Sequence, residues 1–267
     1  GAYAQFFGKR DSKTSDIPTN NTTDENVIEN PVQPEKEKTM EELKNEFVKT
    51  INNSFNVEEK DISKIERINT EKSIVYIAYS IQQENKFYDI DLNIPMINIK
   101  GNIPKEFNKV TQEVFVKKAN EVRKNKNNAE KIIYSIDYVG YLNDNILSII
   151  IKSSLKQGNN PQRIIIQTYN YNIETKEKVS LNNIIEQKNI NVQELQNKIN
   201  DVLKSVKKEE TILINSGYPV YERNLESEIY KIENITNFFL NGEGKLYIVF
   251  AYGNQNFTSE FDIVKYE

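Results

Sequence analysis

The stretch that decides the fold is residues 132–155, IIYSIDYVGYLNDNILSIIIKSSL. Two runs in it, Ile132–Leu142 and Ile146–Leu155, are rich in β-branched and aromatic residues and flank the short polar turn Asn143–Asn145. Such residues favour strands, and a short Asn/Asp turn between two strands is typical of a β-hairpin. A third run of the same character, Arg163–Ile173, follows. The three runs predict an antiparallel meander.

Upstream of the meander, the residues Ser73–Ile81 and Phe87–Ile94 are predicted as strands, and Pro95 is expected to end the second. A helix is predicted to begin at Thr39, where Thr-Met-Glu-Glu forms a capping-box pattern. Apolar residues then recur at spacings of three and four, as on one face of a helix. They are Met40, Leu43, Phe47, Ile51 and Phe55.

Two further helices are expected. One begins at Ile103-Pro104, because proline is favoured in a first helical turn. Its buried side is predicted to be Ile103, Phe107, Val110 and Val114. The other is Ile190–Lys207, with an inner face of Val192, Leu195, Ile199, Val202, Leu203 and Val206.

The C-terminal part predicts a hairpin of Phe238–Leu240 and Lys245–Tyr252, and then a last strand, Phe257–Tyr266. Helices fall between groups of strands and do not alternate with them one by one. This order favours an α+β fold with largely antiparallel sheets packed with about three helices.

The chain is expected to have three parts. Residues 1–38 resemble a flexible linker next to a membrane, because the tract from Asp11 to Lys38 is polar, contains Pro18, Pro31 and Pro34, and has few apolar residues to bury. Residues 39–155 and 156–267 are expected to form N-terminal and C-terminal α+β subdomains.

Composition excludes several kinds of chemistry. The 267 residues include no cysteine and no histidine, so thiolate catalysis, disulfides, a Ser-His-Asp triad and a histidine-ligated metal are excluded. With 35 Lys+Arg against 39 Asp+Glu, the net charge of -4 gives no drive toward nucleic acid. We therefore expect no enzyme activity, no cofactor, no metal site and no nucleic-acid partner.

One pair of residues keeps a catalytic alternative open. Asp89 and Asp91 are two apart on a predicted strand, so both carboxylates face the same way. Such a pair is suited to acid–base work or to binding a hard cation. An exposed strand face explains the pair more simply.

Two segments are candidates for ligand contact. The loop Gln157–Pro161 is expected to contribute Gln157, Asn159 and Asn160, because binding residues concentrate on loops held by a rigid scaffold. Several of the 15 tyrosines occur late in the chain, and Tyr is a good contact residue for proteins and sugars. The second candidate patch consists of Tyr252, Asn254, Asn256 and Phe257.

Several segments together resemble a known extracellular region. They are Asn145–Ile149, Tyr169–Ile185, Asn237–Leu240 and Gly244–Gly253. The second is similar to a "YNFDL-TGK-L-L-DLF" pattern, and the last two to a closing "FYL … GL-FYF-PYE" hairpin. This region is shared by RsiV-type anti-sigma factors and the accessory domain of PdaC-type peptidoglycan deacetylases. The resemblance covers roughly residues 70–267.

The chain departs from this pattern at two places. Relatives often carry a "GGAHG" loop, whereas the matching stretch Lys156–Arg163 has no histidine. Residues 254–260 also replace the usual continuation after "PYE". These departures bear on the identity of the ligand.

The resemblance implies a function. In RsiV-like proteins an extracellular domain binds lysozyme, a signal-peptidase site near the membrane becomes exposed, and cleavage leads to release of a cytoplasmic sigma factor. Ala2 and Ala4, in the small-x-small sequence Ala-Tyr-Ala ahead of the linker, stand where that cleavage site belongs.

The leading hypothesis is therefore an extracytoplasmic sensor domain of a Gram-positive regulator, anchored by an upstream membrane segment. Its partners would be a lysozyme-like protein or a peptidoglycan fragment, together with signal peptidase. The alternative is a non-signalling wall-binding module of a secreted enzyme or lipoprotein.

Overall fold

The computed structural model describes residues 37–51, 54–56, 65–252 and 260–267. Lys38–Glu267 group into one compact unit. Residue 155, where two subdomains were expected to meet, lies inside strand β5 (Ile146–Gln157), which is paired on both sides. Nearly all of the expected linker, residues 1–38, lies outside the described residues.

The larger sheet is built around the predicted meander, which is confirmed. Its strands run in the order β2 (Val75–Glu84), β3 (Tyr88–Ile97), β4 (Ile132–Asn143), β5, β6 (Arg163–Asn172) and β7 (Glu177–Lys178), and β1 (Ser54–Asn56) pairs with β4. The β3–β4 and β1–β4 pairings are parallel, and the other pairings within the described strands are antiparallel. The predicted α+β class with largely antiparallel sheets is confirmed.

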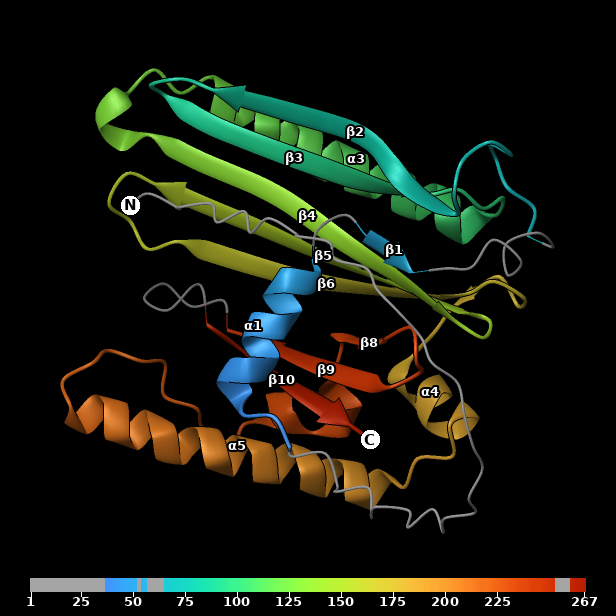
Figure 1. The fold of residues 1–267 in the computed structure, drawn as a ribbon, viewed down its shortest axis with the longest axis vertical. Coiled ribbons are helices and arrows are strands. Elements are labelled where there is room, and N and C mark those ends of the chain that lie inside the picture. Colours follow the sequence, from blue (N-terminus) through green and yellow to red (C-terminus); the bar gives the residue numbers. More distant parts are fainter. Residues whose placement is uncertain (1–36, 52–53, 57–64, 253–259) are drawn as a thin grey trace, which may run out of the picture. The chain divides into compact units, whose positions relative to one another are not determined.

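The second sheet has three strands, in the order β10 (Phe261–Tyr266), β9 (Leu246–Ala251) and β8 (Phe238–Leu240). Among the described residues, the helices are α1 (Met40–Thr50), α3 (Asn102–Arg123), α4 (Leu181–Gln187) and α5 (Val192–Asn215). Short 3₁₀ turns occupy Asn128–Glu130, Glu228–Tyr230 and Ile232–Asn234. Figure 1 shows α3 behind the larger sheet and α5 alongside the smaller one.

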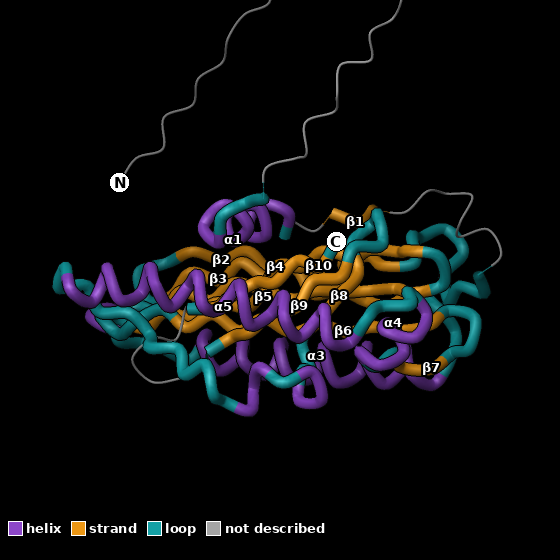
Figure 2. Tube along the Cα trace, turned by 90° about the horizontal axis from the view of Figure 1, so that it is seen from below, coloured by secondary structure: helices purple, strands orange, loops and turns teal. Residues whose placement is uncertain are grey.

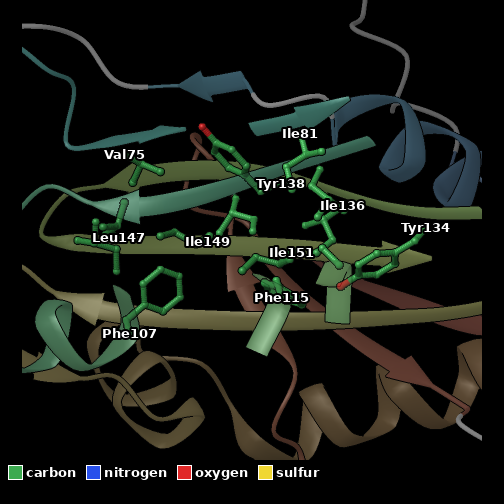
Figure 3. Packing of buried hydrophobic residues seen from close by; sticks show 14 of the residues in the cluster. Val75, Ile81, Phe107, Phe115, Tyr134, Ile136, Tyr138, Leu147, Ile149 and Ile151 are labelled. Carbon is green, nitrogen blue, oxygen red and sulfur yellow. The ribbon is translucent and has the colours of Figure 1, made fainter. Parts of the chain in front are cut away.

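Three apolar clusters hold these layers together. Helix α3 covers one face of the larger sheet, where Phe107 and Phe115 pack against Leu147, Ile149 and Ile151 (Figure 3). Helices α4 and α5 cover the smaller sheet. A third cluster lies between the two sheets and includes Phe47 of α1. Helices α1 and α3 therefore lie on opposite sides of the larger sheet (Figure 2).

Polar side chains of the larger sheet fix β8 against it. Ser148 Oγ accepts from the Leu240 amide at 3.2 Å and donates to Asn170 Oδ1 at 2.6 Å. Asn170 Nδ2 donates in turn to Phe238 O at 2.8 Å. Ser148 and Asn170 are buried, so these bonds satisfy polar groups that water does not reach.

The prediction that Pro95 ends a strand was wrong, because β3 continues to Ile97. A proline cannot donate to a ladder, but pairing of β3 with β4 has already stopped at Leu92. On the other side, the register with β2 shifts between Ile77 and Tyr79, opposite Pro95. The irregularity accommodates the missing N–H.

Two helical faces also differ from expectation. The capping of α1 by Thr39 is confirmed, since Thr39 Oγ1 accepts from the Glu42 amide at 3.2 Å, but the helix ends at Thr50 and Phe55 belongs to β1. In α3, Val110 and Val114 are exposed. The buried face instead comprises Pro104, Phe107, Asn108, Thr111, Phe115, Ala119 and Val122, so a threonine and an alanine take places that stronger apolar residues were expected to fill.

The C-terminal helices differ in length and number. The inner face of α5 is confirmed at Leu195, Ile199, Leu203 and Val206, but Val192 is exposed and the helix extends to Asn215. The short helix α4, which we did not predict, begins at a capping box in which Ser180 and Asn183 bond each other reciprocally.

Candidate ligand-binding site

A pocket of about 210 Å³ opens where α1 meets the β8–β9 turn. Helix α1 forms one wall, and the β8–β9 hairpin and β4 form the other. The lining residues are Leu43, Glu46, Phe47, Thr50, Tyr141, Phe239, Asn241, Gly242, Glu243 and Tyr247. The pocket thus joins aromatic surface with hydroxyl, amide and carboxylate groups, a combination found in small-molecule sites.

Stacked rings form the pocket's apolar part. Phe239 lies between Tyr141 and Tyr247, with ring centroids 6.1 and 4.9 Å away and interplanar angles of 10° and 7°. Phe239 and Tyr247 are direct cross-strand partners in the hairpin, which sets their spacing. Phe47 of α1 stacks on Phe239 at 6.0 Å. The rings are therefore held in fixed positions by three different parts of the fold.

The two tyrosine hydroxyls remain protonated. Burial raises the pKa of Tyr141 and of Tyr247, although hydrogen bonding with Thr50 lowers that of Tyr141 and the charge of Lys265 lowers that of Tyr247. A neutral phenol donates as well as accepts. The hydroxyls can thus serve a ligand that presents both donors and acceptors.

The hairpin turn at the pocket is held by side-chain hydrogen bonds. Asn241 Oδ1 accepts from the amides of Glu243 and Lys245 at 3.0 and 2.9 Å. Gly244 has a φ of +80°, and a Cβ there would lie 2.9 Å from the side-chain amide of Asn143. The backbone conformation therefore favours glycine at this position, and a Cβ there would also require the side chain of Asn143 to shift.

Helix α1 is fastened to the body by a few specific contacts. Phe47 packs on Phe261 at 5.8 Å between ring centroids, and the Ile263 amide donates to the sulfur of Met40 at 3.4 Å. Lys44 Nζ lies 3.3 Å from Asp262 Oδ1 and 5.4 Å from the ring of Phe261. On the exposed side, Lys38 forms an ion pair with the pocket residue Glu46.

A buried polar network beneath α1 centres on Asp262. Arg223 donates to this carboxylate through Nε and Nη2, both at 2.9 Å, and to the carboxylate of Glu260 through Nη1 at 3.0 Å. Tyr252 also donates to Asp262, and the hydroxyls of Tyr230 and Tyr252 lie 2.8 Å apart. Asp262 is fully buried, and such a charge is tolerated only when it is paired and hydrogen-bonded.

Two of the tyrosines late in the chain, Tyr230 and Tyr252, are buried in this network. Tyr252, predicted to contact a ligand, has 5% of its surface exposed, and its hydroxyl has protein partners. Burial raises the pKa of Tyr252, as does the neighbouring charge of Asp262. Asn254, Asn256 and Phe257 lie outside the described residues, as do Ala2 and Ala4 of the predicted cleavage site.

The predicted contact residues Gln157, Asn159 and Asn160 are exposed around the β5–β6 turn. They lie far from the pocket. Gln157 pairs with Ile132 at one end of the hairpin, whereas Tyr141 pairs with Ser148 nine residues along β4. At the rise of a strand this is about 30 Å. The structure does not bring this loop and the pocket together.

The pair Asp89 and Asp91 does not gain further ligands. Asp89 forms an ion pair with Lys131 Nζ at 3.0 Å, and Asp91 is exposed. In the part of the chain that the structure describes, no three His, Cys, Asp or Glu residues gather to hold a metal ion.

The pocket was not predicted from the sequence, because its lining residues come from distant segments of the chain. Tyr247 and Phe239 could have been placed together from the predicted hairpin. Glu46 and Thr50 of α1 could not, because no local pattern indicates which strand a helix packs against.

No protein-family model matches the chain, and no curated protein matches it. Several solved structures are similar to it, two of which have the following match. One is a DUF3298 family protein from Pseudomonas aeruginosa PAO1, with a TM-score of 0.41 and 11% identity over 72% of this chain and 86% of that chain. The other, a DUF3298 family member from Bacteroides fragilis, has a TM-score of 0.34 and 11% identity over 67% and 80%.

Neither likeness assigns a role to a residue of this chain. Among the described helices, none is both long enough and apolar enough to cross a lipid bilayer.

Proposed function

We propose that the chain is an extracytoplasmic, non-enzymatic binding domain that senses the cell envelope, and that its ligand site is the pocket between α1 and the β8–β9 turn. The observation that carries this proposal is the composition of the pocket walls. One wall is α1, which directly follows the linker-like residues 1–38, and the other belongs to the body of the fold.

A site shared by α1 and the body couples two events. A ligand that touches both walls favours the state in which α1 is docked, because it binds that state more tightly. The docked helix fixes where the preceding segment leaves the domain. Ligand binding would thereby change access to residues 1–38, including Ala2 and Ala4, as a cleavage-triggered sensor requires.

The pocket is suited to one sugar ring of a wall glycan. Its volume of about 210 Å³ is small, and its polar groups are the neutral hydroxyls of Thr50, Tyr141 and Tyr247, an amide and two carboxylates. Carboxylates accept from sugar hydroxyls and disfavour an anion. A protein ligand such as lysozyme would need a much larger surface, roughly 800 Å² on each partner, and could place only a side chain here.

The test is calorimetric titration of the full chain with soluble peptidoglycan disaccharide fragments and, separately, with lysozyme. Saturable binding of the fragments supports the proposal. Tight binding of lysozyme alone would leave a sensor but move its site away from the pocket, and heat with neither would overturn the proposal.

A matched pair of variants locates the site. Tyr247→Phe keeps the ring stack and removes one hydroxyl at the pocket, so the affinity for fragments should fall about three- to tenfold. Tyr218→Phe removes a hydroxyl from a side chain that is 62% exposed near the end of α5, and should leave affinity unchanged. Equal affinities for both variants would contradict the pocket as the site.

The alternative, a non-signalling wall-binding module, uses the same pocket without the link to residues 1–38. Cleavage by signal peptidase, measured with and without ligand, distinguishes the two proposed functions. Ligand-dependent cleavage after Ala4 in membranes favours the sensor, and ligand-independent cleavage favours the module.

A further inference from the structure

The N-terminus of α3 lies open and uncapped. No side chain caps it, its first turn contains no acidic residue, and its cap position is Gly101 with a φ of +144°. The first backbone bond of the helix runs from the Lys105 amide to Gly101 O at 3.2 Å. Pro104 has no N–H. Within the described residues the amides of Asn102 and Ile103 therefore have no acceptor, at the positive end of a 22-residue helix dipole.

A second, independent feature lies at the same corner. The hydroxyl of Tyr171, on β6, is buried and has no hydrogen-bond partner among the described residues. Only 3% of the Tyr171 surface is exposed. Buried polar groups in folded proteins nearly always have a partner, so an orphaned hydroxyl calls for one.

Gly101 lies between the helix N-terminus and the Tyr171 hydroxyl. A Cβ at this position would lie 3.5 Å from the Tyr171 hydroxyl and 3.5 Å from Cδ of Pro104. With glycine there, the hydroxyl borders the helix terminus without a side chain between them. A small group at the terminus could approach both.

The charges around this corner are mostly positive. Lys105 is exposed in the first turn of α3, and Lys100 Nζ lies 3.0 Å from Glu66 Oε1. Lys176 also lies close enough to act on Glu66, and hydrogen bonding with Lys100 lowers the pKa of that carboxyl. With the exposed Glu106 of α3 included, three lysines and two glutamates lie at or next to this corner, and one of the glutamates, Glu66, is paired with Lys100.

We propose that this corner binds an oxyanion, a phosphate or carboxylate group, through the amides of Asn102 and Ile103 and the hydroxyl of Tyr171. Lys105 adds attraction without a fixed contact. Burial raises the pKa of Tyr171, so its hydroxyl stays protonated and able to donate. The site is separate from the pocket at α1, and it stands whether or not that pocket binds a glycan.

The test is an NMR titration of the full chain with inorganic phosphate and, in parallel, with acetate. The backbone amide signals of Asn102 and Ile103 should shift in a saturable manner with at least one anion. Stronger binding of phosphate would identify a phosphate group as the natural ligand, and stronger binding of acetate a carboxylate. No saturable shift at these two amides with either anion would overturn the proposal.

Two variants and a control test the donors. Tyr171→Phe removes one hydrogen bond to a charged group, so affinity should fall about tenfold. Gly101→Ala places a methyl group between hydroxyl and terminus and should weaken binding at least as much. Tyr138→Phe, at another buried tyrosine of the same apolar cluster, should bind as the unaltered chain does. Unchanged affinity in Tyr171→Phe would contradict the assignment.

Discussion

Lys44 of α1 lies 3.3 Å from the buried carboxylate of Asp262, the same carboxylate that Arg223 holds through two hydrogen bonds. This contact ties the docking of a surface helix to the most buried charge of the smaller sheet. Helix α1 also walls the candidate pocket, so the Asp262 network supports the site without touching a ligand.

Removing the charge of Asp262 should be costly. In Asp262→Asn, Arg223 remains buried at 5% exposure beside a neutral amide, and Lys44 loses its partner. Breaking one partner of a buried pair typically costs about 3–5 kcal/mol. Urea unfolding at pH 7 should show a loss of this size. Glu228→Gln is the control, because its ion pair with Lys231 is exposed and should contribute little to stability. Similar losses in the two variants would contradict a central role for the network.

The stability conferred by Asp262 should depend on pH. Burial by itself would raise the pKa of Asp262, but hydrogen bonds from Arg223 and the charges of Lys44 and Arg223 outweigh it and hold the pKa below its usual value. A carboxyl with a lowered folded-state pKa stabilises the protein above its unfolded pKa of about 3.9, and this contribution is lost as the pH falls through the folded pKa. The difference in unfolding free energy between the unaltered chain and Asp262→Asn should therefore stay constant from pH 7 to 5. It should shrink below about pH 4. A difference that grows on acidification would contradict the sign.

Gly244→Ala should destabilise the turn at the pocket. The new methyl group would meet the Asn143 amide at 2.9 Å, and a φ of +80° strains any residue with a Cβ. A loss of about 1–3 kcal/mol is expected by thermal or urea unfolding. Gly217→Ala has a similar positive φ but nothing within 4 Å, so it isolates the backbone part. Equal losses at both positions would mean that the approach to Asn143 adds nothing.

Tyr171→Phe should raise stability in buffer free of oxyanions. The hydroxyl is buried without a partner, a state that typically costs about 1–3 kcal/mol, and phenylalanine fills the same space. Unfolding free energy should rise in buffers that contain no phosphate or carboxylate, and the gain should diminish when phosphate is added. Lower stability of the variant in anion-free buffer would show that the hydroxyl already has a partner.

The strands of the fold were largely predictable, and the candidate site was not. The β4–β6 meander follows from β-branched runs separated by Asn, Asp and Gly, since each signal lies within a few residues. The exposed side of α3 was mistaken because Thr111 and Ala119 are buried while Val110 is exposed, a choice that packing decides. Likewise, α5 extends past Lys207, where the buried Glu210 accepts from the Arg223 amide, a contact outside the helix that no local pattern indicates.

The candidate pocket and the proposed oxyanion site at the N-terminus of α3 could not be predicted from local sequence patterns either. Each joins residues far apart along the chain: Glu46 with Tyr247 in one, and Gly101 with Tyr171 in the other. From the sequence, ligand contact was predicted for the loop 157–161 and for Tyr252, because an exposed tyrosine contacts ligands well. In the fold, Tyr252 serves the Asp262 network, and the half-buried Tyr141 and Tyr247 line the pocket.

The most direct test of the account is hydrogen exchange of the full chain with and without a saturating peptidoglycan fragment. We predict slower amide exchange in α1 and in the β8–β9 turn, Asn241–Lys245, when the fragment is bound, with little change around Gln157–Asn160. Protection confined to the β5–β6 turn, or absent from α1, would contradict the claim that the ligand binds between α1 and the body of the domain.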